Sequence, residues 1–173
     1  MIISVQDIRK YREIAQNTQQ NRIEIFIREV EQLDVLPLLG VEETERLSAA
    51  GEQGSTIVLT DDEKKLLDGG TWTDDCEKLH KFEGLKAACS YLTFARFIRN
   101  HPLQVTPFGV VVKETDESSP ASAQSIAGVS KDSEKIGRQY LAEAVKFWQH
   151  TLSSNCGNQP TPYQKKKFYA IGD

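Results

Sequence analysis

The sequence predicts a mainly α-helical fold: a small bundle of four or five helices with one short β-hairpin or strand pair. Apolar residues recur at helical spacing in three long stretches, near residues 20–34, 83–99 and 133–152, as they do in helices that share a core. Residues 105–113 are instead rich in β-branched and aromatic residues, which favour strands. With 173 residues, 39% of them hydrophobic, the chain is large enough for one domain with one core.

Two amphipathic helices are expected in the first forty residues. Ser4 and Asp7 have the spacing of a capping box. Apolar residues then follow at helical spacing, at Val5, Ile8, Tyr11 and Ala15. After a polar break, the second helix carries an apolar stripe at Ile23, Phe26, Ile27, Val30 and Leu33. Pro37 and Gly40 predict its end, because proline disfavours helix in the residue before it and glycine favours a stop.

The next thirty residues have a weaker pattern. Residues 41–49 are compatible with another short helix, and residues 50–55 with a loop. Thr60 and Glu63 again have capping-box spacing, and Leu66 and Leu67 before Gly69 predict a helix of about two turns. Trp72 follows in a polar segment that is typical of a turn.

The most apolar helix is predicted from Glu83 to Arg99. One side carries Leu85, Ala88, Cys89, Leu92 and Ala95, and a second side carries Tyr91, Phe94 and Ile98. A helix that is apolar around so much of its circumference belongs in the middle of a bundle. A strand follows from Val105 to Val112, and Pro107, which has no N–H, limits it to a sheet edge or to a strand's first residues.

The last third combines a flexible linker, a long helix and a tail. Residues 114–125 form the linker by composition, since they are rich in Ser, Asp and Glu. A final helix begins near Ser133, and its expected buried stripe is Ile136, Tyr140, Leu141, Ala144, Val145, Trp148 and Leu152. Residues 155–173 form an extended C-terminal tail, in which 165–171 is a candidate strand partner for 110–112. The chain is therefore one domain, residues 1–173, whose linker and tail we expect to become ordered only on assembly.

Composition argues against several function classes. The net charge of −4 argues against sequence-specific nucleic-acid binding, which normally uses a basic face. No stretch is long and apolar enough to cross a membrane, and the first residues lack the apolar region of a signal peptide. Cys76, Cys89 and Cys156 are odd in number and irregularly spaced, which favours reduced thiols in a cytoplasm.

No cofactor, metal site or catalytic residue is predicted. Cys76 and His80 are four residues apart, but a structural zinc site needs about four ligands, and no second Cys/His pair accompanies them. The carboxylates of residues 61–63 lie where a helix N-terminus favours negative charge. The signatures of α/β-hydrolases, zincins and P-loop proteins do not occur. We therefore expect a protein that is not an enzyme, with an enzyme lacking a recognised motif as the third alternative.

Two groups of basic residues have alternative interpretations. Arg96 and Arg99 lie at the C-terminal end of the long apolar helix, where cations offset the helix dipole, and they are also candidates to meet a partner's carboxylates. The lysines of residues 165–167 lie beside Phe168 and Tyr169. In an acidic protein this short run favours a solvated tail or an interface strand over nucleic-acid stacking.

A family resemblance rests on motifs distributed along the chain. They are IREVEQLDVLPLLG at 27–40, LDGGTW at 67–72, GLK at 84–86 leading to FARFI at 94–98, and VTPFGVVVK at 105–113. Together they resemble a family of virion structural proteins of tailed phages and prophages of Bacteroides and related bacteria, including crAss-like phages. The resemblance extends from about residue 20 to residue 163. The chain departs from the family's pattern at residues 41–57, where Glu and Gly replace aromatic residues.

The resemblance implies a helical head-tail connector, an adaptor that forms a ring between portal and tail. Its partners would be further copies of itself, the portal protein, and tail or neighbouring connector proteins. Its location would be the bacterial host cytoplasm during assembly and then the head-tail junction of the virion. The candidate interface residues are Arg96, Arg99, Thr106, Pro107, Phe108, Val111, Lys113, Phe168 and Tyr169. The second alternative is a small protein-binding or regulatory module of a mobile element.

Overall fold

The fold is mainly helical, as predicted. The computed structural model describes residues 1–16, 18–52, 54–100, 103–106, 109–112 and 122–155. The helices are α1 (Val5–Tyr11), α2 (Gln20–Val30), the π-helix η1 (Glu31–Val35), α3 (Leu36–Leu39), α4 (Val41–Ala50), α5 (Asp61–Asp68), α6 (Gly84–Asn100) and α7 (Ala123–Asn155). The strands are β1 (Gly70–Thr73), β2 (Leu79–Phe82), β3 (Leu103–Thr106) and β4 (Gly109–Val112).

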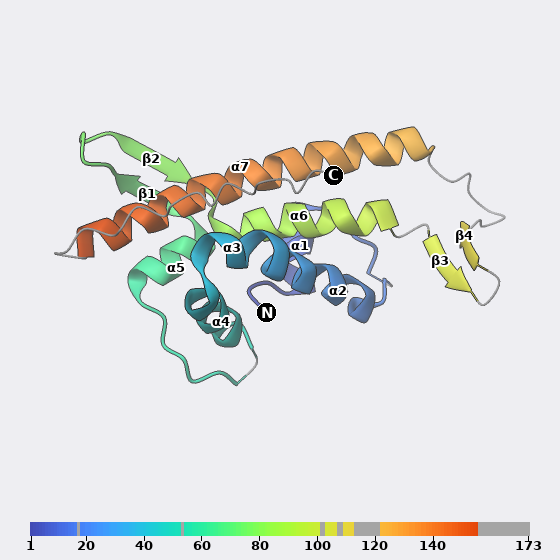
Figure 1. Ribbon diagram of the computed structural model, residues 1–173, viewed down its shortest axis with the longest axis horizontal. Coiled ribbons are helices and arrows are strands. Elements are labelled where there is room, and N and C mark those ends of the chain that lie inside the picture. The colour runs from blue at the N-terminus through green and yellow to red at the C-terminus, as the bar shows by residue number, and fades with distance from the viewer. Residues whose placement is uncertain (17, 53, 101–102, 107–108, 113–121, 156–173) are drawn as a thin grey trace, which may run out of the picture.

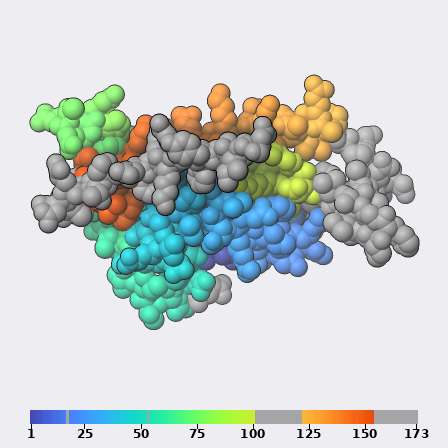
Figure 2. All heavy atoms as spheres, viewed as in Figure 1, coloured from blue at the N-terminus to red at the C-terminus, as the bar shows by residue number. Residues whose placement is uncertain are grey.

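The centre of the fold is an antiparallel pair of long helices, α6 and α7. They run side by side in Figure 1, and no other pair of elements makes a more extensive contact in the described structure. Helices α1, α2 and α5 also pack against α6. In the space-filling view, α2 to α4 cover a broad part of the face shown, with α7 along its upper edge (Figure 2). The predicted place of α6 in the middle of the bundle is therefore confirmed.

The core is formed by the apolar faces that periodicity predicted. Ile8, Ile23 and Ile27 are fully or almost fully buried. The predicted side of α6 is buried along its length, at Leu85, Ala88, Cys89, Leu92 and Ala95. Both predicted capping boxes are present, at the N-termini of α1 and α5. These local signals were sufficient because each acts within a few residues of the chain.

The predicted burial of Leu33 is wrong, and the π-helix explains why. Leu33 is 65% exposed, whereas Val35 is fully buried. A π-helix turn accommodates one more residue than an α-helical turn, so the buried stripe of α2 shifts along the chain within η1. The same shift buries the carboxylates of Glu31 and Asp34. Glu31 accepts a hydrogen bond from the backbone N–H of Ile2 and so fastens the N-terminal segment to the bundle.

The segment around Trp72 is a hairpin rather than the turn that was expected. Strands β1 and β2 pair antiparallel, with Gly70 opposite Phe82 and Trp72 opposite His80. Asp74 Oδ1 accepts from the backbone N–H groups of Cys76 and Lys78 and so shapes the connecting turn. Phe82 is buried, and the hairpin lies against the C-terminal part of α7 (Figure 1).

The predicted strand at 105–112 is divided into two short strands. Leu103–Thr106 pairs antiparallel with Gly109–Val112, so the predicted hairpin exists, with Thr106 opposite Gly109 and Val111 opposite Gln104. Thr106 is the last residue of β3, and Val111 lies within β4. The predicted pairing with the tail, and candidate residues Pro107, Phe108, Lys113, Phe168 and Tyr169, lie outside the described residues.

The last helix begins about three turns earlier than its apolar pattern predicted. It begins at Ala123 instead of near Ser133, so the last residues of the predicted linker are helical. Ser122 explains the start, because its Oγ accepts from the backbone N–H of Ser125, as an N-cap residue does. The first turns are mostly exposed, so they carry no apolar stripe. At the other end Leu152 is 44% exposed, and its predicted burial is wrong.

Candidate functional site

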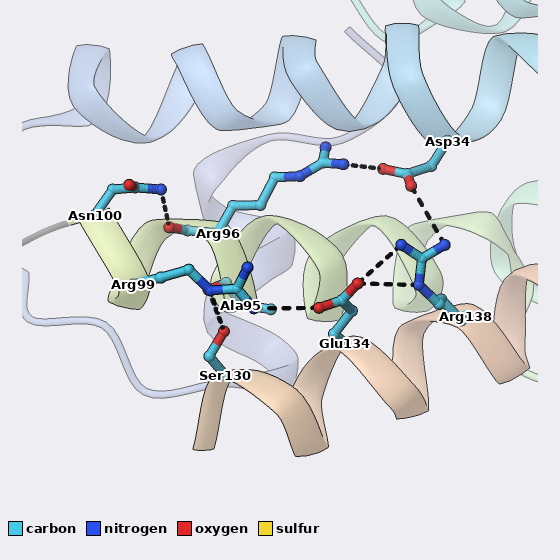
Figure 3. Close-up of polar contacts among 8 residues, drawn as sticks. All are labelled: Asp34, Ala95, Arg96, Arg99, Asn100, Ser130, Glu134 and Arg138. Carbon is cyan, nitrogen blue, oxygen red and sulfur yellow. Dashed lines mark hydrogen bonds and ion pairs between the residues drawn. The ribbon is translucent and has the colours of Figure 1, made fainter. Parts of the chain in front are cut away.

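Five charged side chains from three elements meet where η1, α6 and α7 come together (Figure 3). Arg96 and Arg99 lie on α6, Glu134 and Arg138 on α7, and Asp34 on η1. We name the three arginines the arginine cluster. The group contains both arginines of α6 that the sequence singled out, and it connects elements that are distant in sequence.

Asp34 is the buried anchor of this group. Its side chain is 6% exposed, and its Oδ2 forms an ion pair with Nη2 of Arg96 at 2.8 Å. Arg138 Nη1 lies farther away, 3.9 Å from Asp34 Oδ1. Removing a carboxylate from water is unfavourable unless it is paired, so the two guanidinium groups stabilise the burial that the π-helix imposes.

Glu134 connects Arg99 and Arg138 near the surface. Its Oε1 accepts hydrogen bonds from Nε and Nη2 of Arg138, at 3.1 and 2.8 Å. Its Oε2 accepts from Nη2 of Arg99 at 3.2 Å. The hydrogen bond from Arg138 is the main cause that lowers the pKa of Glu134 below its usual value, and the positive charge of Arg138 and the bond from Arg99 act in the same direction. Glu134 is therefore held in its charged form.

A buried serine connects Arg99 to the backbone of its own helix. Arg99 Nε donates to Ser130 Oγ at 3.2 Å, and Ser130 Oγ donates to the carbonyl oxygen of Ala95 at 2.9 Å. Ser130 is fully buried between the two helices. This chain of hydrogen bonds fixes one end of the Arg99 guanidinium, while more than half of its side chain stays exposed.

A cavity of about 150 Å³ lies within this group. Its lining residues come from both helices and are Leu92, Ala95, Arg96, Arg99, Glu134 and Arg138. Apolar atoms of α6 therefore contribute to the same cavity as three guanidinium groups. The arrangement can bind an anion, because guanidinium groups offer several N–H donors in a fixed plane.

The sequence identified part of this site. It singled out Arg96 and Arg99, and the structure shows that each pairs with a carboxylate of its own chain. Their role toward a partner stays a prediction. Glu134 and Arg138 were missed, although their spacing of four residues was a visible signal for a helical ion pair. Asp34 carried no such signal, because its burial depends on the π-helix.

A second polar cluster lies where the β1–β2 hairpin meets α7. The Trp72 ring stacks on His80, with centroids 4.7 Å apart, and lies 4.8 Å from the ring of His150. His80 Nε2 is 2.8 Å from Asp74 Oδ2, and this hydrogen bond is the main cause that lowers the pKa of Asp74. These contacts hold the hairpin against α7. This structural role is sufficient to explain the aromatic and polar residues of the cluster.

The described part of the chain contains no group of three or more His, Cys, Asp or Glu residues arranged to hold a metal ion. Cys76 and His80 do not share a helical face, since Cys76 lies in the turn and His80 in β2. Cys89 is a free thiol on α6, and burial raises its pKa far above the ordinary value. Such a thiol is a poor nucleophile at neutral pH.

A hollow of about 850 Å³ lies between the N-terminal segment, α2 and α4. Glu24, Arg28, Glu31 and Glu52 are among its lining residues. These residues are of mixed charge, and their side chains do not define a common binding point.

No helix among the described residues is both long and apolar enough to cross a membrane.

Comparison with known proteins identifies a family. The model of a family described as "Family of unknown function (DUF6712)" matches residues 36–160, which is more than half of the chain. The matched range includes α6, α7, the three residues of the arginine cluster and Glu134, whereas Asp34 precedes it. No curated protein and no solved structure matches the chain.

Proposed function

This chain belongs to DUF6712, a family of unknown function, and we propose that it is a non-enzymatic virion structural protein. Its role would be that of a head-tail connector, which forms a ring between the portal and the tail of a tailed phage or prophage. The proposal rests on the resemblance of residues 20–163 to such proteins and on one structural feature, the β3–β4 hairpin. The comparisons assign no function to the family.

The β3–β4 hairpin supports the proposal because it offers sheet edges to another chain. Among the described residues, each of its two strands has the other as its only partner. In Figure 1 the hairpin lies beyond the C-terminal end of α6, away from the helices. Unpaired N–H and C=O groups at a strand edge are a template for pairing with a neighbouring chain. Neighbouring subunits of a ring would use such an edge.

The helical body supports the same role in a second way. A connector must keep its shape while its edges pair with neighbours, and the long, extensively packed α6–α7 pair is the base from which the hairpin extends. The partners we propose are further copies of this chain, the portal protein, and tail or neighbouring connector proteins. The complex would form in the bacterial host cytoplasm and remain at the head-tail junction.

A charged substitution in β4 tests the role of the hairpin. Val111→Asp places a carboxylate in a strand of four residues that includes Val110 and Val112. We expect it to weaken ring formation or portal binding by at least about tenfold, because a charge at a completed sheet interface is unfavourable. Folding should change much less than assembly, because a strand at the edge of a sheet tolerates a charge.

Val58→Asp is the matched control, since Val58 is 82% exposed and lies in the segment before α5. Native mass spectrometry with the portal protein of the same genome would measure assembly, and circular dichroism would measure folding. Equal loss of folding and assembly in Val111→Asp, or normal assembly in that variant, would contradict the role of the hairpin.

A further inference from the structure

The arginine cluster has more positive charge than its own chain balances. It contains three guanidinium groups, from Arg96, Arg99 and Arg138, and the carboxylates of Asp34 and Glu134 face them. One positive charge is left over within the group, in a protein whose net charge is −4. Ordinary ion pairing at a surface does not require this local excess of positive charge in an acidic protein.

The cluster also has hydrogen-bond donors without acceptors. The Nη1 atom of Arg96 is buried and has no hydrogen-bond partner in the described structure. Arg138 Nη1 lies 3.9 Å from Asp34, which is too far for a hydrogen bond. Arg99 uses Nε and Nη2, toward Ser130 and Glu134 respectively. Buried N–H groups normally have partners, so the unpaired Nη1 of Arg96 indicates capacity for one more acceptor. The side chains of Arg99 and Arg138 are more than half exposed, so their remaining N–H groups are open to an acceptor from outside the chain.

The three side chains surround a common space. In Figure 3, Arg99 and Arg138 approach Glu134 from opposite sides, and Arg96 extends past them toward Asp34. The cavity that they line measures about 150 Å³. Liquid water occupies about 30 Å³ per molecule, so the cavity has room for a carboxylate group.

We propose that this cavity binds a single carboxylate group, supplied by a free carboxylic acid or by an Asp or Glu side chain of another protein chain. The chemistry favours a carboxylate because the planar guanidinium fork matches its two oxygens, and Glu134 already takes two hydrogen bonds from Arg138. The phosphates of a nucleic acid are disfavoured by the negative net charge of the protein. The proposal does not depend on the connector role.

Acetate is the probe that tests the cavity. The arginine Nε–H signals of the full chain are followed by NMR while sodium acetate replaces sodium chloride at constant ionic strength. Saturable shifts of the signals of Arg99 and Arg138 are expected. Shifts that stay linear over the whole titration, or that are equal for all arginines, would overturn the proposal.

Two variants make the test specific, one at a residue that lines the cavity and one at a residue that does not. Arg99→Gln removes one charge and about three of the five N–H donors, and we expect it to weaken acetate binding by at least about tenfold, as the loss of a charge-assisted hydrogen bond predicts. Its side chain is 56% exposed, so folding should be kept. Lys135→Gln removes the same charge from an exposed position of α7 that does not line the cavity, and it should bind acetate as the unaltered chain does.

Equal weakening in both variants would overturn the proposal, because it would indicate a general effect of charge. Phosphate that binds in the cavity more tightly than acetate at equal ionic strength would overturn the preference for a carboxylate. Sedimentation velocity distinguishes a second copy of this chain from the other sources of the carboxylate. Self-association that acetate reverses, and that Arg99→Gln weakens, would assign the carboxylate to a second copy. A monomer that binds acetate would assign it to a free acid or to a different protein.

Discussion

The two ends of the α6–α7 pair are held together by different chemistry. Near the start of α6, Phe82 stacks on Phe147 of α7 with ring centroids 4.8 Å apart, and Trp72 lies beside the same ring. Near the end of α6, Arg99 meets Ser130 and Glu134. We call these the aromatic end and the ionic end.

The difference between the ends indicates where the pair is fixed and where it has capacity to bind. Buried aromatic area stabilises the aromatic end, and that contribution is not screened by salt as an ion pair is. Exposed ion pairs at the other end contribute little each and are screened by salt. An exposed guanidinium group at the ionic end, such as that of Arg99, therefore loses little when its acceptor changes, which is the property that a carboxylate site requires.

The largest effect is expected from Phe147→Ala. Phe147 is 4% exposed, and its removal leaves a cavity beside Phe82 and Trp72, which costs about 3–5 kcal/mol. Urea unfolding followed by circular dichroism measures the change. Leu152→Ala is the control on the same helix, because Leu152 is 44% exposed. A loss below about 1 kcal/mol for Phe147→Ala would contradict the importance of the aromatic end.

A smaller loss is expected from Arg96→Gln at the ionic end. It leaves the buried carboxylate of Asp34 with only the more distant Arg138, and we expect a cost of about 2–3 kcal/mol. The double variant Asp34→Asn with Arg96→Gln should recover part of this loss, because the unpaired charge is then absent. Additive losses in the same urea experiment would indicate that the two residues do not interact.

Glycine substitutions test the packing between the two ends. A Cβ added to Gly137 would lie 2.7 Å from Leu92 Cγ and 3.1 Å from the carbonyl oxygen of Ala88. Alanine gains about 1 kcal/mol of helix propensity, but overpacking costs more, so Gly137→Ala should destabilise by about 1 kcal/mol. Gly128, with no atom within 4 Å of an added Cβ, is the control, and its alanine variant should be stabilised. A higher melting temperature for both variants would contradict the close approach of α6 and α7.

The smallest effect is the pH dependence of Glu134. Its pKa is lowered from 4.5 in the folded protein, so its pairs contribute stability above the unfolded pKa, and that contribution is lost as pH falls through the folded pKa. The difference in stability between the unaltered chain and Glu134→Gln should be below about 1 kcal/mol near neutral pH. It should narrow on acidification and in high salt. A difference that is constant with pH would exclude the ion pair as its source.

The sequence was sufficient to predict local features of the helices. It was not sufficient to predict the contacts that join distant segments at the aromatic and ionic ends. The apolar face of α6 was predicted, as were the capping boxes of α1 and α5, because periodicity and capping act over a few residues. The pairing of Glu134 with Arg138 was visible in the same way. The stacking of Phe82 on Phe147 joins residues far apart in the sequence, and no periodic pattern encodes it.

The two main departures have physical causes of different kinds. The π-helix exchanges Leu33 for Val35 in the core, and a pattern built on regular helical spacing cannot include the extra residue. Helix α7 begins at Ala123 because Ser122 caps it, although its first turns are mostly exposed and show no apolar stripe. The predicted alternative, a linker up to residue 125, relied on composition alone.

The most direct measurement of the connector role is quantitative mass spectrometry of tailed particles purified from the encoding strain after prophage induction. The account predicts that this chain is present in the particles, in a fixed ratio to the portal protein. Intact tailed particles that contain portal and capsid proteins without this chain would contradict it, and would favour a protein-binding module of the mobile element.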